Sequence, residues 1–542
     1  MGNNKETGSV GGSIILNGSI LAIAQIITRL IGLFYRIPLQ RIAGDVAMGY
    51  YGYAFDIYMT LLLFSSNGVP VAVSKLVANA KGKNDARNEY RILKSALILT
   101  FAIGAIVGIG TFVFAEQITD FLYGSNMRGV VPALRVLAPT IFLCCVMSTI
   151  RGYMQGIGTS VPTAVSQIFE QIANAIVSVA AAYLLVSRGA AYAAMGGTLG
   201  TCIGALVSTI FLFGLYIAYR PRLMRRVRLD KKSKPIPYSQ IYTLLAVTLG
   251  PMILSSVIFQ ISGIIDSSLY STILTDLGYE ADLISSLYGI YTSKYKILIN
   301  VPMALAAALG ISVVPDISAS MVSGNMDEIR DKIHLTVKFC MLIAIPATVG
   351  LSVLGGPIMM MLFGDNSALT VRLITIGTPY LLFYSLATVT IGVLQGIDKM
   401  RVPIYNSGIA LVIHTVFIYI LLKFCNMNIY AIMYSNILFG FILSLLNHLC
   451  LKKFIGYRQE IKETFVLPSI ASVVMGFATF VTYKGLYRVL HINIIATMIA
   501  IFVAMIVYAV VLIRLGGISE KEIYAFPKGA VLVRVLKKCH VL

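Results

Sequence analysis

Apolar runs long enough to cross a lipid bilayer recur along this sequence, from Ile14 to the region of Arg514. A helix needs about 20 residues for each crossing, so about 14 transmembrane helices would use most of the chain and leave short loops. Charged residues make up 12% of the chain, against about 25% in soluble domains. Long unbroken runs also differ from the short alternating strands of a β-barrel. We therefore expect an all-α polytopic membrane protein.

Positive residues are concentrated in one set of connecting segments. If the N-terminus is cytoplasmic, the expected cytoplasmic segments hold 28 Lys and Arg residues and the external loops hold six. Because Lys and Arg are retained on the cytoplasmic side, both termini are expected there, and the number of spans is even. The net charge of +20 is then explained by the cytoplasmic Lys and Arg residues that fix the topology and attract anionic membrane lipids. We therefore expect no nucleic-acid partner.

The sequence repeats itself with a period near 240 residues. FLYGSN at 121–126 recurs as MLFGDN at 361–366, and GYMQGIG at 152–158 recurs as GVLQGID at 392–398. An even number of spans in each copy makes both copies run the same way through the membrane, as in the parallel repeats of transporters.

This repeat predicts two pseudo-symmetric six-helix lobes plus two C-terminal helices. The expected boundaries are 1–219 for the N-lobe, 220–238 for a basic cytoplasmic linker, 239–449 for the C-lobe, 450–463 for a cytoplasmic loop, 464–514 for the two appended helices and 515–542 for a cytoplasmic tail.

Several polar and charged residues lie inside expected spans, where they are costly unless they face a cavity or a partner. The corresponding first (13–33), second (47–78), seventh (240–271) and eighth (286–322) spans are the richest in such residues, which predicts a shared cavity. Its cations outnumber its carboxylates, and the planar guanidinium of arginine suits phosphate in particular. The candidate substrate-binding cations are Arg29, Arg36, Lys294 and Lys296, and the candidate polar or ion-coupling residues are Gln25, Asp56, Asn67, Glu170 and Asp266.

Structural roles compete with these assignments. Arg36 lies near the end of its span and could extend its charge to the interface. Glu170 could be a hydrogen-bonded structural carboxylate, and Asp266 could pair with a cation of the cavity. Arg29 has the fewest structural explanations, because it lies at mid-span depth.

Motifs of enzymes and metal sites are missing from the sequence. The seven cysteines contain no CxxC pair, so we expect no disulfide framework, metal site or cofactor. There is no HExxH or GxSxG motif and no long external loop. The chain is therefore expected not to be an enzyme, with a membrane-embedded glycosyltransferase as the alternative from a different class.

Four segments resemble a known group of transporters. They are TRLIGLFYRIPL at 28–39, GVPVAVSKLVANAKGK at 68–83, RGYMQGIGTSVPTAVSQIFEQIANAI at 151–176 and GVLQGIDKMRVP at 392–403. They are similar to the polysaccharide-biosynthesis branch of the MOP (MATE-like) flippase superfamily, above all to MurJ-type lipid II flippases and the stage V sporulation protein B group. The resemblance covers essentially the whole chain.

This resemblance implies a flippase of the bacterial cell membrane that works by alternating access. Its cargo would be an undecaprenyl-pyrophosphate-linked peptidoglycan precursor, lipid II, moved from the inner to the outer leaflet, and cell-wall synthases could be partners. MurJ-type proteins carry an Arg-x-x-Gly-x-x-Arg pattern in the first span; Arg29 and Gly32 match it, and Arg36 falls one residue late. Whether an ion is coupled stays open.

Two other transport functions fit the same resemblance. One is export of another lipid-linked oligosaccharide, such as a teichoic acid or capsule unit. The other is a MATE-type multidrug exporter, which the excess of cations over carboxylates in the expected cavity speaks against.

Overall fold

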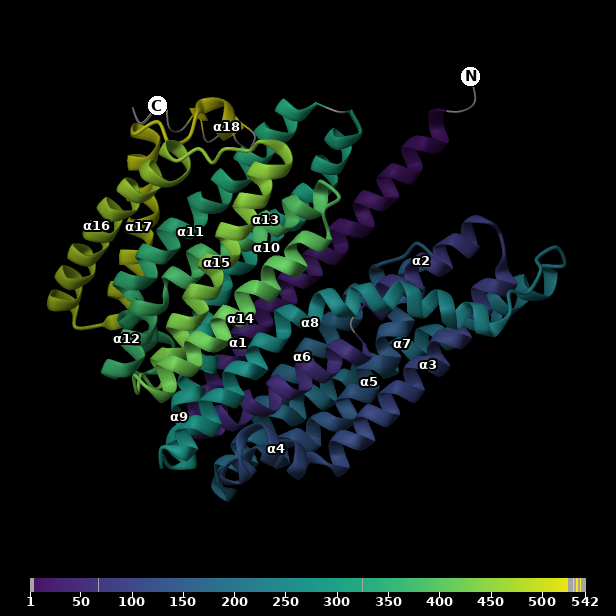
Figure 1. Ribbon diagram of the computed structural model, residues 1–542, viewed down its shortest axis with the longest axis horizontal. Helices are drawn as coiled ribbons and strands as arrows, with labels where there is room; N and C mark the ends of the chain where they lie inside the picture. Colours follow the sequence, from purple (N-terminus) through teal and green to yellow (C-terminus); the bar gives the residue numbers. More distant parts are fainter. Residues whose placement is uncertain are drawn as a thin grey trace. The chain divides into compact units, whose positions relative to one another are not determined.

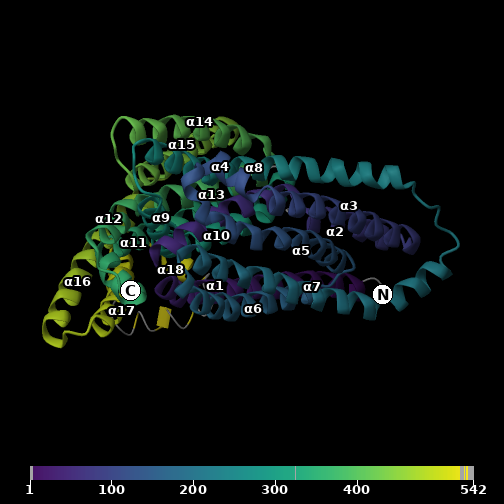
Figure 2. The same ribbon diagram turned by 90° about the horizontal axis from the view of Figure 1, so that it is seen from below.

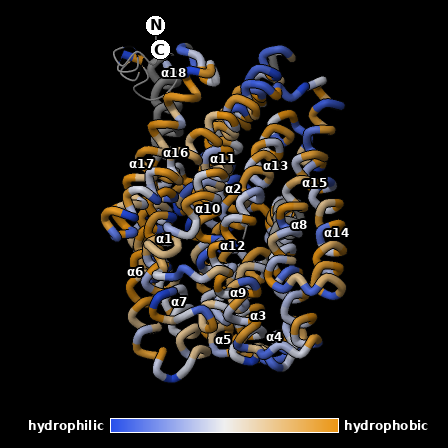
Figure 3. Tube along the Cα trace, turned by 90° about the vertical axis from the view of Figure 1, so that its left-hand side faces the viewer, coloured by the Kyte–Doolittle hydropathy of each residue, from blue (hydrophilic) through white to orange (hydrophobic). Residues whose placement is uncertain are grey.

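The protein is built from helices. In the part of the chain described by the computed structural model every regular element is helical, which confirms the expected all-α class (Figure 1). Ten of the described helices are long and apolar enough to cross a membrane, and Figure 3 shows hydrophobic residues along most of their length. The count of about 14 spans stays a prediction. The described residues are 4–66, 68–323, 325–524, 530, 533–534 and 537.

The chain forms two compact units, Met1–Ser293 (unit 1) and Lys294–Leu542 (unit 2). The expected lobe boundary at 220–238 stays a prediction. The helices of unit 1 are α1 (Asn4–Ser65), α2 (Val69–Gly82), α3 (Ala86–Val113), α4 (Ala115–Tyr123), η1 (Ser125–Val130), α5 (Val131–Gly156), α6 (Val161–Leu185), η2 (Val186–Arg188), α7 (Ala190–Leu229), α8 (Tyr238–Asp276) and α9 (Ala281–Ile290).

Unit 2 begins within a π-helical segment, η3 (Tyr291–Tyr295), that interrupts the eighth expected span. In unit 2 the appended helices α16 and α17 lie side by side (Figures 1 and 2). Its helices are α10 (Lys296–Ser323), α11 (Met326–Phe363), α12 (Ala368–Gly377), α13 (Pro379–Gly396), α14 (Arg401–Lys423), α15 (Ile429–Ile455), η4 (Lys462–Val466), α16 (Leu467–Leu490), α17 (Asn493–Arg514) and α18 (Glu520–Tyr524).

Helix α1 contains the first expected span and the first part of the second. The helix is interrupted at Gly44, whose φ of 79° lies in a region that glycine adopts without strain. It ends at Ser65, and Gly68, with a φ of 85°, caps the start of α2. The second expected span is therefore broken between the end of α1 and the larger part of α2.

Paired glycines bring corresponding helices of the repeat into close contact. In unit 1 a Cβ on Gly152 of α5 would lie 2.7 Å from backbone atoms of Pro70 in α2. In unit 2 a Cβ on Gly392 of α13 would lie 2.2 Å from the carbonyl oxygen of Gly310 in α10. Each is followed four residues later by a second close-packed glycine, Gly156 or Gly396. The repeated sequence therefore builds the same helix packing in each unit.

The two copies also end these helices in the same way. The amide of Thr159 donates to the Met154 carbonyl at 3.1 Å, and the amide of Lys399 donates to the Leu394 carbonyl at 2.9 Å. The residue before the donor has a positive φ in both copies, 91° at Gly158 and 60° at the corresponding Asp398.

Helix α7 extends into the segment expected to link the lobes. It ends at Leu229, so the first half of 220–238 is helical. The following stretch is tied to α3, because the side chain of Asn88 donates to the Lys234 carbonyl at 2.9 Å and accepts from the Ile236 amide at 2.8 Å.

Candidate functional site

Arg29 lies on an exposed part of α1. Its side chain and that of Gln25 are both exposed. Gly32, one turn further on, faces α6, since a Cβ there would lie 3.9 Å from Oε1 of Gln171. Among the described residues no carboxylate pairs with Arg29, so its guanidinium is available to an anion.

Arg36 is half-buried among aromatic side chains of α1. Its guanidinium lies 5.8 Å from the centre of the Phe55 ring and interacts with the hydroxyl groups of Tyr35 and Tyr51. Asn174 of α6 donates to the Tyr35 hydroxyl at 3.3 Å. These contacts orient the side chain without neutralising it, and within the described ranges no carboxylate forms an ion pair with it.

Asp56 lies at the edge of a buried tyrosine cluster in unit 1. The hydroxyl of Tyr288 in α9 donates to the Asp56 carboxylate at 2.5 Å. The Tyr288 ring stacks on Tyr53 with 4.2 Å between ring centres, and Tyr53 packs against Tyr123 at 4.7 Å. Sequence reasoning found Asp56 but missed these tyrosines, because aromatic residues inside a span are indistinguishable from ordinary core residues.

Asp266 is adjacent in the sequence to Ser267, a residue that contacts the same tyrosine cluster. It is buried, at 4% exposure, on α8. The neighbouring Ser267 places its hydroxyl 3.3 Å from that of Tyr123. Asn67 lies outside the described residues.

Glu170 is held in an ion pair. Its carboxylate accepts a hydrogen bond from Arg151 of α5 at 2.7 Å, and Arg151 also donates to the hydroxyls of Ser166 and Ser208 at 3.0 Å each. The guanidinium thus links α5, α6 and α7. This is the structural role weighed for Glu170 in the sequence, and Arg151 is its unforeseen partner.

Lys294 of unit 2 is also paired. It is 5% exposed, and its ammonium lies 2.6 Å from the carboxylate of Asp365, in the loop after α11. Burial of Asp365 acts to raise its pKa, but hydrogen bonds from Lys294, the Ser367 amide and Thr370 outweigh it and lower the pKa to about 2. Lys296, at the start of α10, is half-buried.

The cations expected in one cavity thus have different surroundings. Arg29 and Arg36 are without carboxylates in the described part of the chain, whereas the charge of Lys294 is balanced by Asp365. No group of three or more His, Cys, Asp or Glu side chains in the described residues could hold a metal ion.

Comparison with known proteins identifies relatives along most of the chain. The sequence model of the family described as "Polysaccharide biosynthesis protein" matches residues 14–321, and that of the MatE family matches residues 288–420. The chain is 27% identical to lipid II flippase MurJ of Bacillus subtilis over 86% of this chain and 88% of that protein. It is 24% identical to stage V sporulation protein B of the same organism, over 85% and 88%.

Solved structures show the same fold. A structure of lipid II flippase MurJ in an inward closed conformation matches with a TM-score of 0.67 and 16% identity, over 91% of this chain and 97% of that one. An inward-facing multidrug resistance MATE transporter of the MOP superfamily matches with a TM-score of 0.63 and 16% identity, over 79% and 94%. The chain is thus a multi-pass membrane protein with the fold of these structures. Because the first family match covers more than half of its length, it belongs to the polysaccharide biosynthesis protein family.

Proposed function

We propose that the protein is a flippase that moves an undecaprenyl-pyrophosphate-linked peptidoglycan precursor, lipid II, from the inner to the outer leaflet of the bacterial plasma membrane by alternating access. The observation that carries the proposal is the presence on α1 of two arginines, Arg29 and Arg36, without carboxylate partners among the described residues. The relative named lipid II flippase, 27% identical, supports the choice of substrate.

The chemistry of pyrophosphate matches these arginines. A guanidinium presents parallel N–H donors that bind phosphate oxygens in pairs. A charge inside a membrane helix is costly, which makes it a candidate for the substrate path. Arg36 has its orientation fixed by Phe55 and the tyrosines, so it loses less side-chain freedom on binding. Arg29 is exposed and would make the first contact.

In unit 2 we propose Lys294 and Lys296 as further phosphate ligands. The ammonium of Lys294 is held by Asp365, so a phosphate there would compete with that carboxylate. Gln25, Asp56 and Asp266 are proposed to supply polar contacts or ion coupling. The termini are proposed to be cytoplasmic, and cell-wall synthases that consume the precursor are proposed partners.

A different lipid-linked oligosaccharide is the second candidate cargo. It is favoured by the 24% identity to stage V sporulation protein B over a comparable length. Such a cargo shares the polyprenyl pyrophosphate, so Arg29 and Arg36 would keep their role. A multidrug exporter of organic cations is disfavoured, because cation binding needs carboxylates whose charge is not already balanced, and the charge of Glu170 is balanced by Arg151.

Genetic rescue tests this proposal. The chain is expressed in a bacterium whose own lipid II flippase is depleted, beside Arg29→Ala, Arg29→Lys and the control Arg188→Ala, which removes an exposed arginine of η2. Membrane levels are measured for all four.

We expect the wild type and Arg188→Ala to restore growth, Arg29→Ala to fail at equal membrane level, and Arg29→Lys to restore it in part. A well-expressed wild type that fails to rescue would redirect the substrate to another lipid-linked sugar. Rescue by Arg29→Ala would support lipid II as the substrate but refute the proposed role of Arg29 in binding it.

A further inference from the structure

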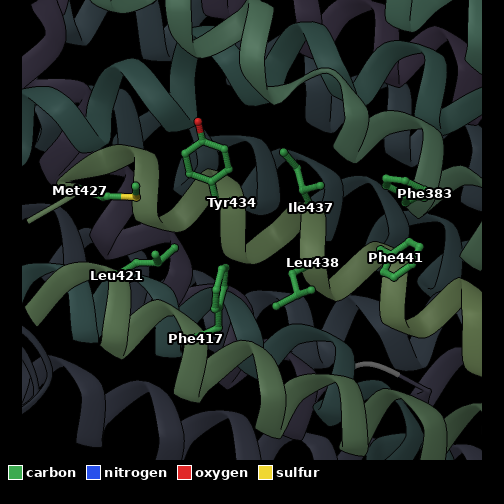
Figure 4. A pocket seen from close by; sticks show the side chains of 8 residues that line it. All are labelled: Phe383, Phe417, Leu421, Met427, Tyr434, Ile437, Leu438 and Phe441. Carbon is green, nitrogen blue, oxygen red and sulfur yellow. The ribbon is translucent and has the colours of Figure 1, made fainter. Parts of the chain in front are cut away.

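Unit 2 contains an apolar cavity that the proposed translocation does not use. It has a volume of about 410 Å³ and lies between α13, α14 and α15, which contribute different side chains from those proposed to bind phosphate (Figure 4). The residues that line it are Phe383, Phe417, Leu421, Met427, Tyr434, Ile437, Leu438 and Phe441.

The cavity extends from the end of the helices to the middle of the membrane-spanning part. Figure 4 shows Leu421 and Met427 at one end, and Phe383 and Phe441 at the other. Met427 belongs to the loop between α14 and α15, and Phe441 lies twelve positions after Ile429, the first residue of α15. At 1.5 Å per residue this is about 18 Å, close to the depth of one leaflet, which is half of a hydrocarbon core of about 30 Å.

Water is a poor occupant of such a cavity. Tyr434 supplies the one polar side chain of the lining, whereas a buried water needs two to four polar partners. An empty cavity would forfeit the dispersion contacts of its walls. The cavity is also open, since Phe441 is 44% and Met427 39% exposed.

The surroundings of this opening are apolar. The segments that carry α13, α14 and α15 are all candidate membrane spans, so the lining lies at the depth of the lipid hydrocarbon. At one end of the cavity the Phe383 and Phe441 rings meet edge to face at 5.3 Å between centres.

We propose that this cavity binds one acyl chain of a membrane phospholipid. The depth of one leaflet fits an acyl chain, whereas an undecaprenyl tail is several times longer than a leaflet is deep. The acyl chain would fill the space between α14 and α15 next to their connecting loop and extend to the Phe383–Phe441 pair. A phospholipid bound there remains on the protein longer than the lipids around it. This proposal is independent of the transported cargo.

The absence of tryptophan from the sequence permits a direct test. Phe441→Trp places a single fluorophore in the cavity. Phe477→Trp places one at the middle of α16, where the side chain is 72% exposed and is not part of the cavity. Both proteins are reconstituted in vesicles of phosphatidylcholine with brominated acyl chains, which quench tryptophan fluorescence. A large excess of unbrominated phosphatidylcholine vesicles is then added, and detergent is used to fuse the two kinds of vesicle.

We expect Phe477→Trp to regain its fluorescence at once. Phe441→Trp should regain it slowly, because a brominated acyl chain retained in the cavity continues to quench the tryptophan. Equally rapid recovery in both would overturn the proposal.

Mass spectrometry of the intact protein in detergent identifies the occupant. We expect the wild type to retain a phospholipid, and Leu438→Trp, which fills the cavity, to lose it. Leu445→Trp is the control, since Leu445 lies on α15 outside the lining and is 44% exposed. A retained polyprenyl lipid, or a phospholipid retained equally by Leu438→Trp, would overturn the proposal. If Leu438→Trp does not fold, the fluorescence comparison decides.

Discussion

In unit 1, Gly152 and Gly156 of α5 face α2, and in unit 2, Gly392 and Gly396 of α13 face α10 at the same positions of the repeat. The residues beside these glycines differ. Arg151 of the first copy is bound to Glu170, whereas the second copy has Ile391 in place of Arg151.

The partner of the ion pair is also apolar in the second copy. At the offset of Pro162 and Pro403, Glu170 corresponds to Leu411. Two charges out of water recover their desolvation cost only when they are well paired, and an apolar pair can be equally stable. The comparison teaches that close helix contact is required in both units, whereas the ion pair is one of two ways to fill the adjacent space.

The largest expected effect comes from breaking the ion pair. Arg151→Ala leaves the Glu170 carboxylate without its cation and should destabilise the protein by about 3–5 kcal/mol. Arg151→Ile combined with Glu170→Leu, the residues of the second copy, should recover most of that loss. Thermal unfolding in detergent measures both variants, and a double variant no more stable than Arg151→Ala would refute the equivalence of the two arrangements.

Adding side chains at the paired glycines should have the next largest effect. Gly152→Val and Gly392→Val each place a Cβ against the backbone of the neighbouring helix, and overpacking costs about 1–3 kcal/mol. Gly408→Val in α14 is the control, since a Cβ there meets nothing within 4 Å. In the same unfolding assay, Gly152→Val and Gly392→Val should both lower the stability of the protein. A loss of stability in only one of these two variants would contradict the equivalence of the two copies.

The smallest expected effect on stability comes from the residue with a positive φ that follows α5 in unit 1 and α13 in unit 2. Asp398, with a φ of 60°, occupies the position that Gly158 holds in the first copy. Because a left-handed backbone is less costly for glycine, Asp398→Gly should stabilise the protein by up to about 1 kcal/mol, and Gly158→Ala should destabilise it by a similar amount. A lower unfolding temperature for Asp398→Gly would contradict this reading of the repeat.

Local sequence patterns predicted the helices well and their interruptions poorly. Apolar runs located the long apolar helices, whereas the matching ends of α5 and α13 at the Gln-Gly-Ile motif were not predicted. The continuation of α1 to Gly44, and of α7 to Leu229, was not predicted. Hydropathy marks where a segment is apolar and not where a helix ends, so polar helical turns beyond the apolar run escape it.

For the candidate site, the sequence identified charged residues and not their partners. Arg29 was predicted from its mid-span depth, whereas Arg36 was a candidate near the end of the same span. Arg151 counted only as a charge in a cytoplasmic segment, because its pairing with Glu170 depends on how α5 packs against α6. Lys294 and Asp365 are likewise brought together by packing, 71 residues apart in the chain.

The most direct test of the central claim is lipid flipping by the purified protein. The wild type, Arg29→Ala, Arg36→Ala and Arg188→Ala are reconstituted in vesicles with fluorescent lipid II, and an impermeant quencher reports how fast the inner-leaflet pool becomes accessible. We predict acceleration by the wild type and Arg188→Ala, and loss of acceleration in both α1 variants. Equal rates in wild-type and protein-free vesicles, or an undiminished rate in Arg29→Ala and Arg36→Ala, would contradict translocation through these arginines.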